Sequence, residues 1–576
     1  MLILQCDEKK PSCNNCIRRQ QICPGYADVF DGAHRSQNHV VIRRLEKQNA
    51  ARDADSTSST PSSDASLELT PFSSRASTDG ASTKPTRPLQ WIIYSSTEEE
   101  RGEDEKMLQL EKAHLPRSAE FDTRTTQITI PVSLRQSPED ASVNFFFRHY
   151  TGTIYDYQLH NSLPMLWQPL YLASAVNSPL RLATAAVTVN ITMMWSFKGC
   201  DARPARKLFT QALTATRQAI DNPSEKAMDE LLLTILIFDL YDALVLHYVR
   251  NRPHDYGKHK DGALALLRHR GEDNFSTQSG RMLANATRNG FIGYCLDKRI
   301  PMPAGSEAFF SHPSLMDSKS TQLESLASQI INTQARLWAI RRGGPFARDI
   351  GRLRQAREEI IADAIRIDEL MMSWRRGITA QEWLPHYISR EDVAPSILAA
   401  GFYGSRCAVW VDLIFAQMSN IYTSQRLLTL QIIRQALADE PSLLVDPKYR
   451  AYLAKANTTV QSLADSILET VPMHLGDTVV PTNPIYSSGI TFPYKVIKDP
   501  LTGEKRSIPP LQGTDFKMKA AAAGGWNIFG HLVDLYRLAE PEDDAEPLNL
   551  RDGQLNWIKG QVKRLQTTFL YSDPVW

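Results

Sequence analysis

Four cysteines lie close together near the start of this 576-residue chain, in the spacing Cys6-x6-Cys13-x2-Cys16-x6-Cys23. Thiolates bind zinc in tetrahedral sites, and a two-residue spacer allows one turn of the backbone to supply two of the ligands. The other cysteines are few and scattered, which does not suit the disulfide framework of a small secreted domain. We therefore predict that Cys6, Cys13, Cys16 and Cys23 are metal ligands.

Basic side chains accompany these cysteines. Lys9, Lys10, Arg18 and Arg19 lie between the first and the last of them. Residues 1–52 contain nine Lys or Arg and five Asp or Glu, whereas the whole chain has a formal net charge of +1. Because lysine and arginine neutralise DNA phosphates, we expect these four cations to contact the backbone of double-stranded DNA.

The cysteine segment resembles the later two-thirds of the fungal Zn(2)-Cys(6) binuclear zinc cluster, the DNA-binding module of a family of fungal transcription factors. That family has the pattern C-x2-C-x6-C, a loop, and then C-x2-C-x6-C. Here Cys6 is similar to the third cysteine of the pattern. The stretch that ends in Cys13 and Cys16 is similar to the loop with the fourth and fifth cysteines, and Cys23-Pro24-Gly25-Tyr26 to the sixth cysteine and its tail.

The resemblance implies two zinc ions shared by six thiolates, and a basic helix before the third cysteine that reads bases in the major groove. Only Met1 to Gln5 precede Cys6, and none of them is basic. We therefore expect an N-terminally truncated module that cannot form the binuclear cluster from this chain alone. Its contact with DNA phosphates should be weak and without base readout. Two explanations stay open: the true start lies upstream, or the module has degenerated and its four thiols bind one zinc ion or none.

The composition divides the chain into three parts. Residues 1–26 are the partial zinc cluster, residues 27–137 a disordered linker, and residues 138–576 a helical domain. From Asp53 to Pro88, 16 of 36 residues are Ser or Thr and four more are Pro. Such a stretch cannot bury enough apolar surface to offset its chain entropy, so we predict disorder there.

Apolar residues recur at steps of three and four through most of the third part, which predicts an all-α domain. The predicted helices are Arg203 to Ile220, Leu231 to Leu246, Leu323 to Ile340, Ile360 to Trp374, Ile397 to Met418 and Tyr449 to Val471. Val479 to Pro510 is an exception. Its Asp499-Pro500-Leu501-Thr502-Gly503 segment predicts a turn that closes a short hairpin.

Several segments of the helical part resemble the regulatory domain that follows the zinc cluster in many of these proteins. They include Phe145-Phe146-Phe147-Arg148-His149-Tyr150, Ser178-Pro179-Leu180-Arg181-Leu182-Ala183 and His259-Lys260-Asp261-Gly262-Ala263. We expect Phe145 to Phe147 to be helix core rather than a ligand box. Gly262 and Ala263 should permit close helix contact, and Ala520 to Gly525 should pack tightly against a neighbouring helix.

The resemblance implies an RNA polymerase II transcription regulator in a fungal nucleus. It would bind zinc and double-stranded DNA, contact the transcription machinery and be regulated through its all-α domain. A homodimer stays open, because Val41 to Gln48 offers about one heptad where a coiled coil needs about three or four. The chain has no HExxH, GxSxG, P-loop or GxGxxG motif, so we expect no enzymatic activity.

Two other hypotheses remain open. The first is a helical protein-interaction or regulatory protein that has lost DNA binding. The second is an all-α enzyme such as a terpene cyclase, for which Asp239-x-x-Asp242 would be the candidate metal motif, although two acids three apart in a buried helix also fit polar contacts. The most apolar window, Met228 to Val249, contains four acidic residues. We therefore predict a buried helix there and no association with a membrane.

Overall fold

The structure, a computed structural model, is all-α over the residues that it describes. These are residues 137–151, 163–196, 203–221, 227–246, 258–316, 318–344, 349–480, 489–508, 513–541 and 543–570. Two short antiparallel ribbons accompany the helices. The all-α prediction is therefore confirmed for this part of the chain, while the partial zinc cluster lies outside it.

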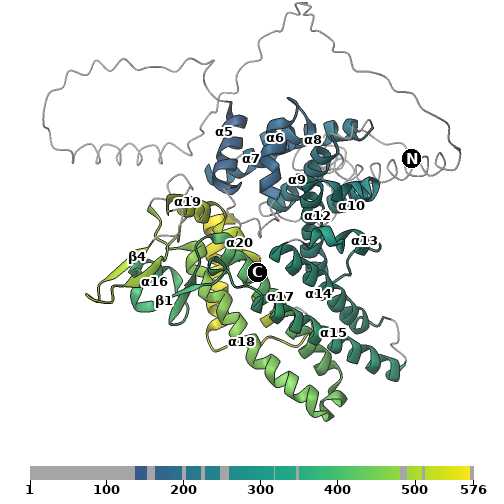
Figure 1. Ribbon diagram of the computed structural model, residues 1–576, viewed down its shortest axis with the longest axis vertical. Coiled ribbons are helices and arrows are strands. Elements are labelled where there is room, and N and C mark those ends of the chain that lie inside the picture. The colour runs from purple at the N-terminus through teal and green to yellow at the C-terminus, as the bar shows by residue number, and fades with distance from the viewer. Residues whose placement is uncertain are drawn as a thin grey trace, which may run out of the picture. The chain divides into compact units, whose positions relative to one another are not determined.

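The first group of helices begins at a capped start. The Ser137 hydroxyl accepts a hydrogen bond from the backbone N–H of Asp140 at 3.0 Å, and Pro138 occupies the first helical position, where its missing N–H has no cost. Helix α7 packs against α5, α8 and α9 (Figure 1). The group comprises α5 (Pro138–Phe146), the π-helical turn η2 (Phe147–Thr151), α6 (Leu163–Ala173), α7 (Pro179–Ser196), α8 (Arg203–Asp221) and α9 (Ala227–Leu246).

Helix α9 is apolar around its circumference because other helices enclose it. Leu231, Leu232, Leu233 and Ile237 are at most 3% exposed. Its neighbours are α7, α8, α10 (Lys258–Arg270) and α12 (Gln278–Lys298). The buried helix predicted from this window is thus confirmed, since a helix that is hydrophobic all round must be enclosed. In the described part of the chain, no helix is both long and apolar enough to cross a membrane.

The middle group leads from α10 to a pair of long helices. Helix α14 starts with a capping box, in which the side chains of Ser318 and Thr321 each accept a hydrogen bond from the other residue's backbone N–H. The last residue of helix α12 is Lys298, and the capping residue after it, Arg299, is a non-glycine residue in the left-handed region with φ 52°. The further elements are α11 (Asp273–Ser276), α13 (Glu307–Phe310), η4 (Pro313–Leu315), α14 (Lys319–Arg341) and α15 (Ile350–Arg376).

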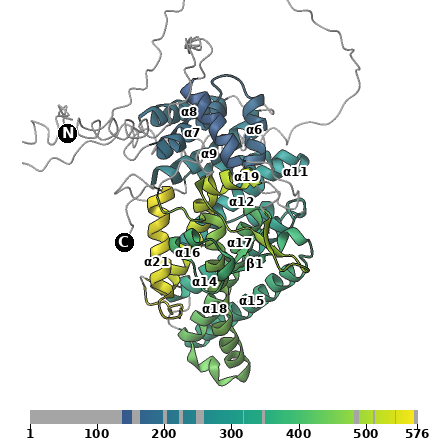
Figure 2. The same ribbon diagram turned by 90° about the vertical axis from the view of Figure 1, so that its left-hand side faces the viewer.

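The third group contains a ribbon and two long helices, α17 and α18, that pack along each other (Figures 1 and 2). Strand β1 pairs antiparallel with β2, with Ile388 opposite Cys407. Strand β2 lies against α18. The elements are η5 (Gln381–Trp383), β1 (His386–Ser389), η6 (Arg390–Asp392), α16 (Pro395–Gly401), β2 (Arg406–Val409), α17 (Leu413–Asp439), η7 (Pro441–Val445) and α18 (Pro447–Leu475).

The continuous helix predicted from Ile397 to Met418 is wrong. Gly401 and Gly404 adopt φ values of 118° and 65°, which end α16 and turn the chain into β2. Asp412 then starts α17, because its carboxylate accepts a hydrogen bond from the backbone N–H of Ile414 at 3.1 Å. Helical periodicity alone cannot distinguish a short buried strand such as β2 from a piece of helix.

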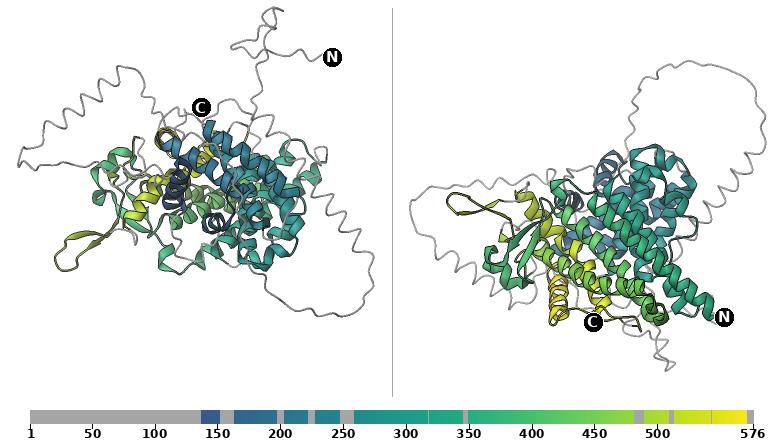
Figure 3. Two further views of the ribbon diagram at one scale, coloured as in Figure 1. Left: turned by 90° about the horizontal axis from the view of Figure 1, so that it is seen from above. Right: turned by 60° about the horizontal axis from the view of Figure 1, so that its bottom comes forward.

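The hairpin predicted around Asp499 is confirmed. Strands β3 (Lys495–Lys498) and β4 (Lys505–Ile508) pair antiparallel, and the ribbon extends away from the helices in Figure 3. The Asp499 carboxylate accepts the N–H groups of Leu501 and Thr502 at 2.7 and 2.9 Å. Gly503 supplies the positive φ of 72° that closes the turn.

The last helices return to pack on α17 and α18. Elements η9 and α20 lie close against their neighbours through two glycines. A Cβ on Gly524 would lie 2.0 Å from the backbone oxygen of His474, and one on Gly525 would lie 2.3 Å from the Phe569 ring. The tight packing predicted for Ala520 to Gly525 is confirmed. The elements are α19 (Gly513–Lys519), the π-helical turn η9 (Ala520–Gly524), α20 (Gly525–Ala539), α21 (Gln554–Leu565) and η10 (Gln566–Leu570).

Two of the segments that resemble the regulatory domain lie in the core. Phe146 and Phe147 are 4% and 9% exposed and place their ring centroids 4.8 and 6.4 Å from that of Trp167, which confirms the core prediction for these two residues. The prediction that Gly262 is needed for close contact between helices is wrong. A Cβ there would lie 3.8 Å from Ile235, an ordinary contact, so close approach does not require glycine at this position.

Candidate functional site: a cavity between four helices

Helices α12, α14, α17 and α20 enclose a cavity of about 820 Å³. Each helix contributes residues at steps of three and four, which form one face of an α-helix. Much of the lining is apolar and includes Leu296, Ile330, Met418, Leu428 and Leu535. A largely apolar cavity of this volume, placed between the helices of a bundle, is typical of sites that bind small organic molecules.

Two π-helical turns meet beside this cavity. His149, Tyr150 and Thr151 of η2 line it, and so does Ala523 of η9. The two turns are in contact with each other. Since π-helical turns are rare and often occur at functional sites, their pairing here supports a role for the cavity. This contact also places η2, near the start of the described residues, against η9, near their end.

Helix α20 presents a polar stripe to the cavity. Asn527, His531 and Asp534 follow at steps of four and three, so they share one face. Across the cavity wall, the hydroxyl of Ser424 on α17 lies 2.7 Å from Nδ1 of His531, and the two groups form a hydrogen bond. Burial lowers the pKa of His531 to about 4, so its imidazole is neutral at pH 7.

The Ser424–His531 pair combines a hydroxyl with an imidazole, as a nucleophile and its base would. A triad also needs a carboxylate that orients the imidazole. Among the described residues, no carboxylate is recorded in contact with His531, and a base with a pKa of about 4 accepts a proton poorly at pH 7. The pair is better suited to hydrogen bonding with a bound molecule.

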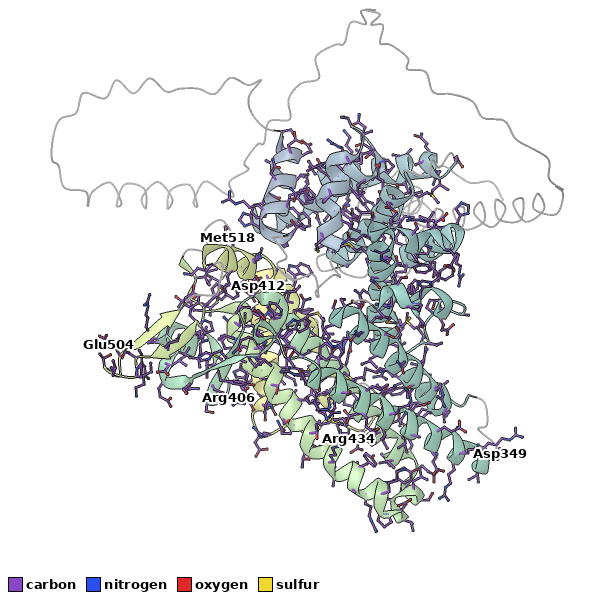
Figure 4. All side chains as sticks on the ribbon, in the orientation of Figure 1. Asp349, Arg406, Asp412, Arg434, Glu504 and Met518 are labelled. Carbon is purple, nitrogen blue, oxygen red and sulfur yellow. The ribbon has the colours of Figure 1, made fainter. Side chains whose placement is uncertain are left out.

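Most charged residues around the cavity have a partner. Their ion pairs join α12, α14, α17 and α20 to neighbouring segments. They are Asp297 with Arg537 at 3.0 Å, Glu324 with Arg288 at 2.7 Å, Asp412 with Lys519 at 3.4 Å, and Arg299 with Asp543. In Figure 4, Asp412 lies close to Met518, the residue before Lys519.

Asp534 differs from these residues. It lines the cavity and is exposed there, and it makes no hydrogen bond or ion pair to any residue that the structure describes. Desolvation by the cavity wall raises the pKa of this carboxyl to about 6, with Arg537 opposing and Asp297 reinforcing the shift. Asp534 is therefore mostly ionised at pH 7, and it forms no ion pair with a described residue.

Two buried amides also face the cavity. Gln334 on α14 and Gln425 on α17 are 6% and 8% exposed and line it. The Oε1 atom of each has no hydrogen-bond partner among the described residues. Leaving a buried polar atom unsatisfied costs about 1–3 kcal/mol. These two oxygens are buried in the cavity wall, so of the two oxygens and the Asp534 carboxylate it is the carboxylate that a bound molecule could reach.

The site residues predicted from sequence lie outside the described residues. They are the four cysteines and the four cations between them, namely Cys6, Cys13, Cys16, Cys23, Lys9, Lys10, Arg18 and Arg19. Within the part that is described, no group of three or more His, Cys, Asp or Glu side chains could hold a metal ion. Cys295 and Cys407 are buried, and burial raises their thiol pKa to about 11 and about 12, which makes them unreactive.

The Asp239-x-x-Asp242 motif forms polar contacts between helices. The Asp239 carboxylate on α9 binds the ammonium of Lys260 on α10. The Asp242 carboxylate, also on α9, lies 3.2 Å from Nε2 of His259 on α10. Both acids therefore already contact side chains of a neighbouring helix. This arrangement agrees with the structural interpretation of the motif and gives no support to a cyclase metal site.

The sequence did not reveal the cavity. The polar stripe of α20 repeats at a helical period, and such a stripe ordinarily faces solvent. Comparison with protein-family models, with curated proteins and with solved structures returned no match. The argument for function therefore rests on the residues and on the geometry of the cavity.

Proposed function

We propose that this protein is a fungal RNA polymerase II transcription regulator of the zinc-cluster class, with an all-α domain that responds to a small molecule. The spacing of Cys6, Cys13, Cys16 and Cys23 supports the class. The cavity carries the regulatory part of the proposal, because it offers about 820 Å³ between four helices and combines an apolar lining with the polar side chains of His531 and Asp534. Its occupant would be the signal.

Zinc and DNA belong to the N-terminal segment in this proposal. The four thiols are a donor set that suits tetrahedral zinc, and the metal would hold the segment folded. Lys9, Lys10, Arg18 and Arg19 would contact phosphates of double-stranded DNA. The protein would act in the nucleus with the transcription machinery, without catalysing a reaction.

The alternative is a helical regulatory or protein-interaction protein that does not bind DNA. The residues that resemble the zinc cluster begin at Cys6, and the base-reading helix of the family is not one of the features that they match. The cavity fits this alternative equally well, because a small molecule can control a protein contact. An experiment that bypasses the zinc cluster separates the two.

A reporter assay provides that experiment. The full chain is fused to an unrelated DNA-binding domain in a fungal strain that carries the matching reporter gene. If the all-α domain regulates transcription, reporter output changes severalfold relative to the DNA-binding domain alone. A fusion protein that is nuclear and abundant but leaves the reporter unchanged would favour the interaction protein instead.

A further inference from the structure

The acids that line the cavity differ in their partners. Asp297, Glu324 and Asp412 each form an ion pair with a basic side chain, and Arg299 with an acidic one. His531 is neutral at pH 7 because burial holds its pKa at about 4. Asp534 lines the cavity and forms no ion pair with a described residue, and Arg537 acts on it only through its charge. A carboxylate on the wall of a largely apolar cavity is suited to pair with a cation.

We propose that the cavity between α12, α14, α17 and α20 binds a small organic cation, a molecule with an apolar body and one protonated amine, and that this amine pairs with Asp534. The inference rests on the proposed role of the cavity as the effector site and adds the class of the effector. An apolar body suits the aliphatic lining formed by Leu296, Ile330, Met418 and Leu535.

The Asp534 carboxylate agrees with a ligand that donates hydrogen bonds. An ionised carboxylate accepts hydrogen bonds and cannot donate them. A protonated amine has donors only, so it complements acceptors and carries the compensating charge. A carboxylate ligand would instead face Asp534 with a like charge, which favours a cation over an anion.

The charge state of Asp534 links binding to pH. Arg537 on the same helix lowers the pKa of Asp534, whereas desolvation and Asp297 raise it, and the outcome is a pKa of about 6. An amine binds the ionised carboxylate, so its affinity falls as the pH drops below about 6. The other charged or titratable groups that line the cavity are His149, Tyr150, Arg299, Glu324, Asp412, Lys519 and His531.

Three matched fluorescent probes test the proposal on the full chain. 1-Pyrenemethylamine carries a cation, 1-pyrenemethanol is neutral, and 1-pyrenecarboxylate carries an anion on the same apolar body. At pH 7.5 the amine should bind about tenfold or more tightly than the alcohol, since hydrogen bonds to charged groups contribute more than neutral ones. The carboxylate should bind most weakly.

Two variants test whether the preference for the amine probe comes from the Asp534 carboxylate. In Asp534→Asn the amine should lose its advantage, while the alcohol keeps its wild-type affinity. Glu369→Gln removes an exposed acid on α15 that does not line the cavity, and it should keep the advantage. If amine and alcohol bind wild type equally, or if Asp534→Asn keeps the preference, the cation class is wrong and the effector cavity stands. If none of the probes binds at its solubility limit, both are wrong.

Discussion

Asp534 is an ionisable residue whose raised pKa makes the stability of the folded protein depend on pH. Its pKa of about 6 in the folded state lies above the ordinary value of 3.8. Between about pH 4 and pH 6 the native protein therefore holds a proton that the unfolded chain has released. Stability contributed by this residue is present below that window and is lost as the pH rises through it.

We expect Asp534→Asn to raise the free energy of unfolding at pH 7 relative to wild type, and to do so less at pH 4.5. Wild type loses stability between pH 4.5 and pH 7 as Asp534 ionises. Asparagine carries no charge, so the variant does not show this loss. Urea unfolding at both pH values measures the difference. Glu369→Gln should show no such change between the two pH values, because Glu369 is exposed on α15. An equal effect of Asp534→Asn at both pH values would contradict the assignment.

The close approach of Gly524 to His474 provides a second prediction, with Gly530 as its control. Gly524→Ala places a methyl group 2.0 Å from a backbone oxygen that cannot move aside, and we expect a loss of about 1–3 kcal/mol in the free energy of unfolding. Gly530 lies in the interior of α20 with nothing within 4 Å of a Cβ. Gly530→Ala should therefore stabilise by about 0.5–1 kcal/mol, because alanine favours helix. If Gly524→Ala leaves the free energy of unfolding unchanged or raises it, the close approach to His474 is wrong.

The helices that enclose the cavity depend on their end groups for their position. Asp412 starts α17 and pairs with Lys519 at 3.4 Å, so a cap also joins α17 to the last residue of α19. Arg299 ends α12 in a left-handed conformation, and its guanidinium lies 3.8 Å from the centroid of the Trp338 ring on α14. For a residue other than glycine that conformation costs roughly 1–2 kcal/mol, and the contact with Trp338 helps to offset it.

The capping box of α14 can be tested as a unit. The hydroxyls of Ser318 and Thr321 accept the N–H groups of each other's backbone at 3.2 and 3.1 Å. Ser318→Ala and Thr321→Ala should each lower the free energy of unfolding by about 1 kcal/mol. The two bonds form one cooperative start, so the double variant should lose less than the sum of the single losses. Urea unfolding of all four proteins measures this coupling, and strictly additive losses would show that the two bonds act independently.

At the scale of the molecule, periodicity predicted five of the long helices because one helix face must be buried, but it identified neither α12 nor most of α17. The predictions for 203–220, 231–246, 323–340, 360–374 and 449–471 fall within α8, α9, α14, α15 and α18. It failed at 397–418, where two glycines and a strand interrupt an apolar run. The cavity could not be predicted, because whether the stripe of Asn527, His531 and Asp534 faces solvent or a cavity depends on which helices pack around α20.

The described helices also act as one unit through their two ends. Element η2 is near the start of this part of the chain and η9 near its end, yet the two turns are in contact and both line the cavity. Helix α20 buries Ile528, Leu532 and Leu535 against its neighbours. The Ser/Thr-rich composition from Asp53 to Pro88 predicts disorder in the segment that precedes these helices.

We therefore expect limited trypsin digestion of the full chain to cut first before the helical domain. Exposed, unstructured backbone fits a protease site, whereas packed helix does not, so a stable fragment should begin between about residue 90 and residue 140. Because α20 and α21 pack on the core, that fragment should retain them. Mass spectrometry of the fragments over time gives both ends. Full protection of residues 53–88, or early loss of residues 525–565 while 53–88 stay intact, would show that this division of the chain is wrong.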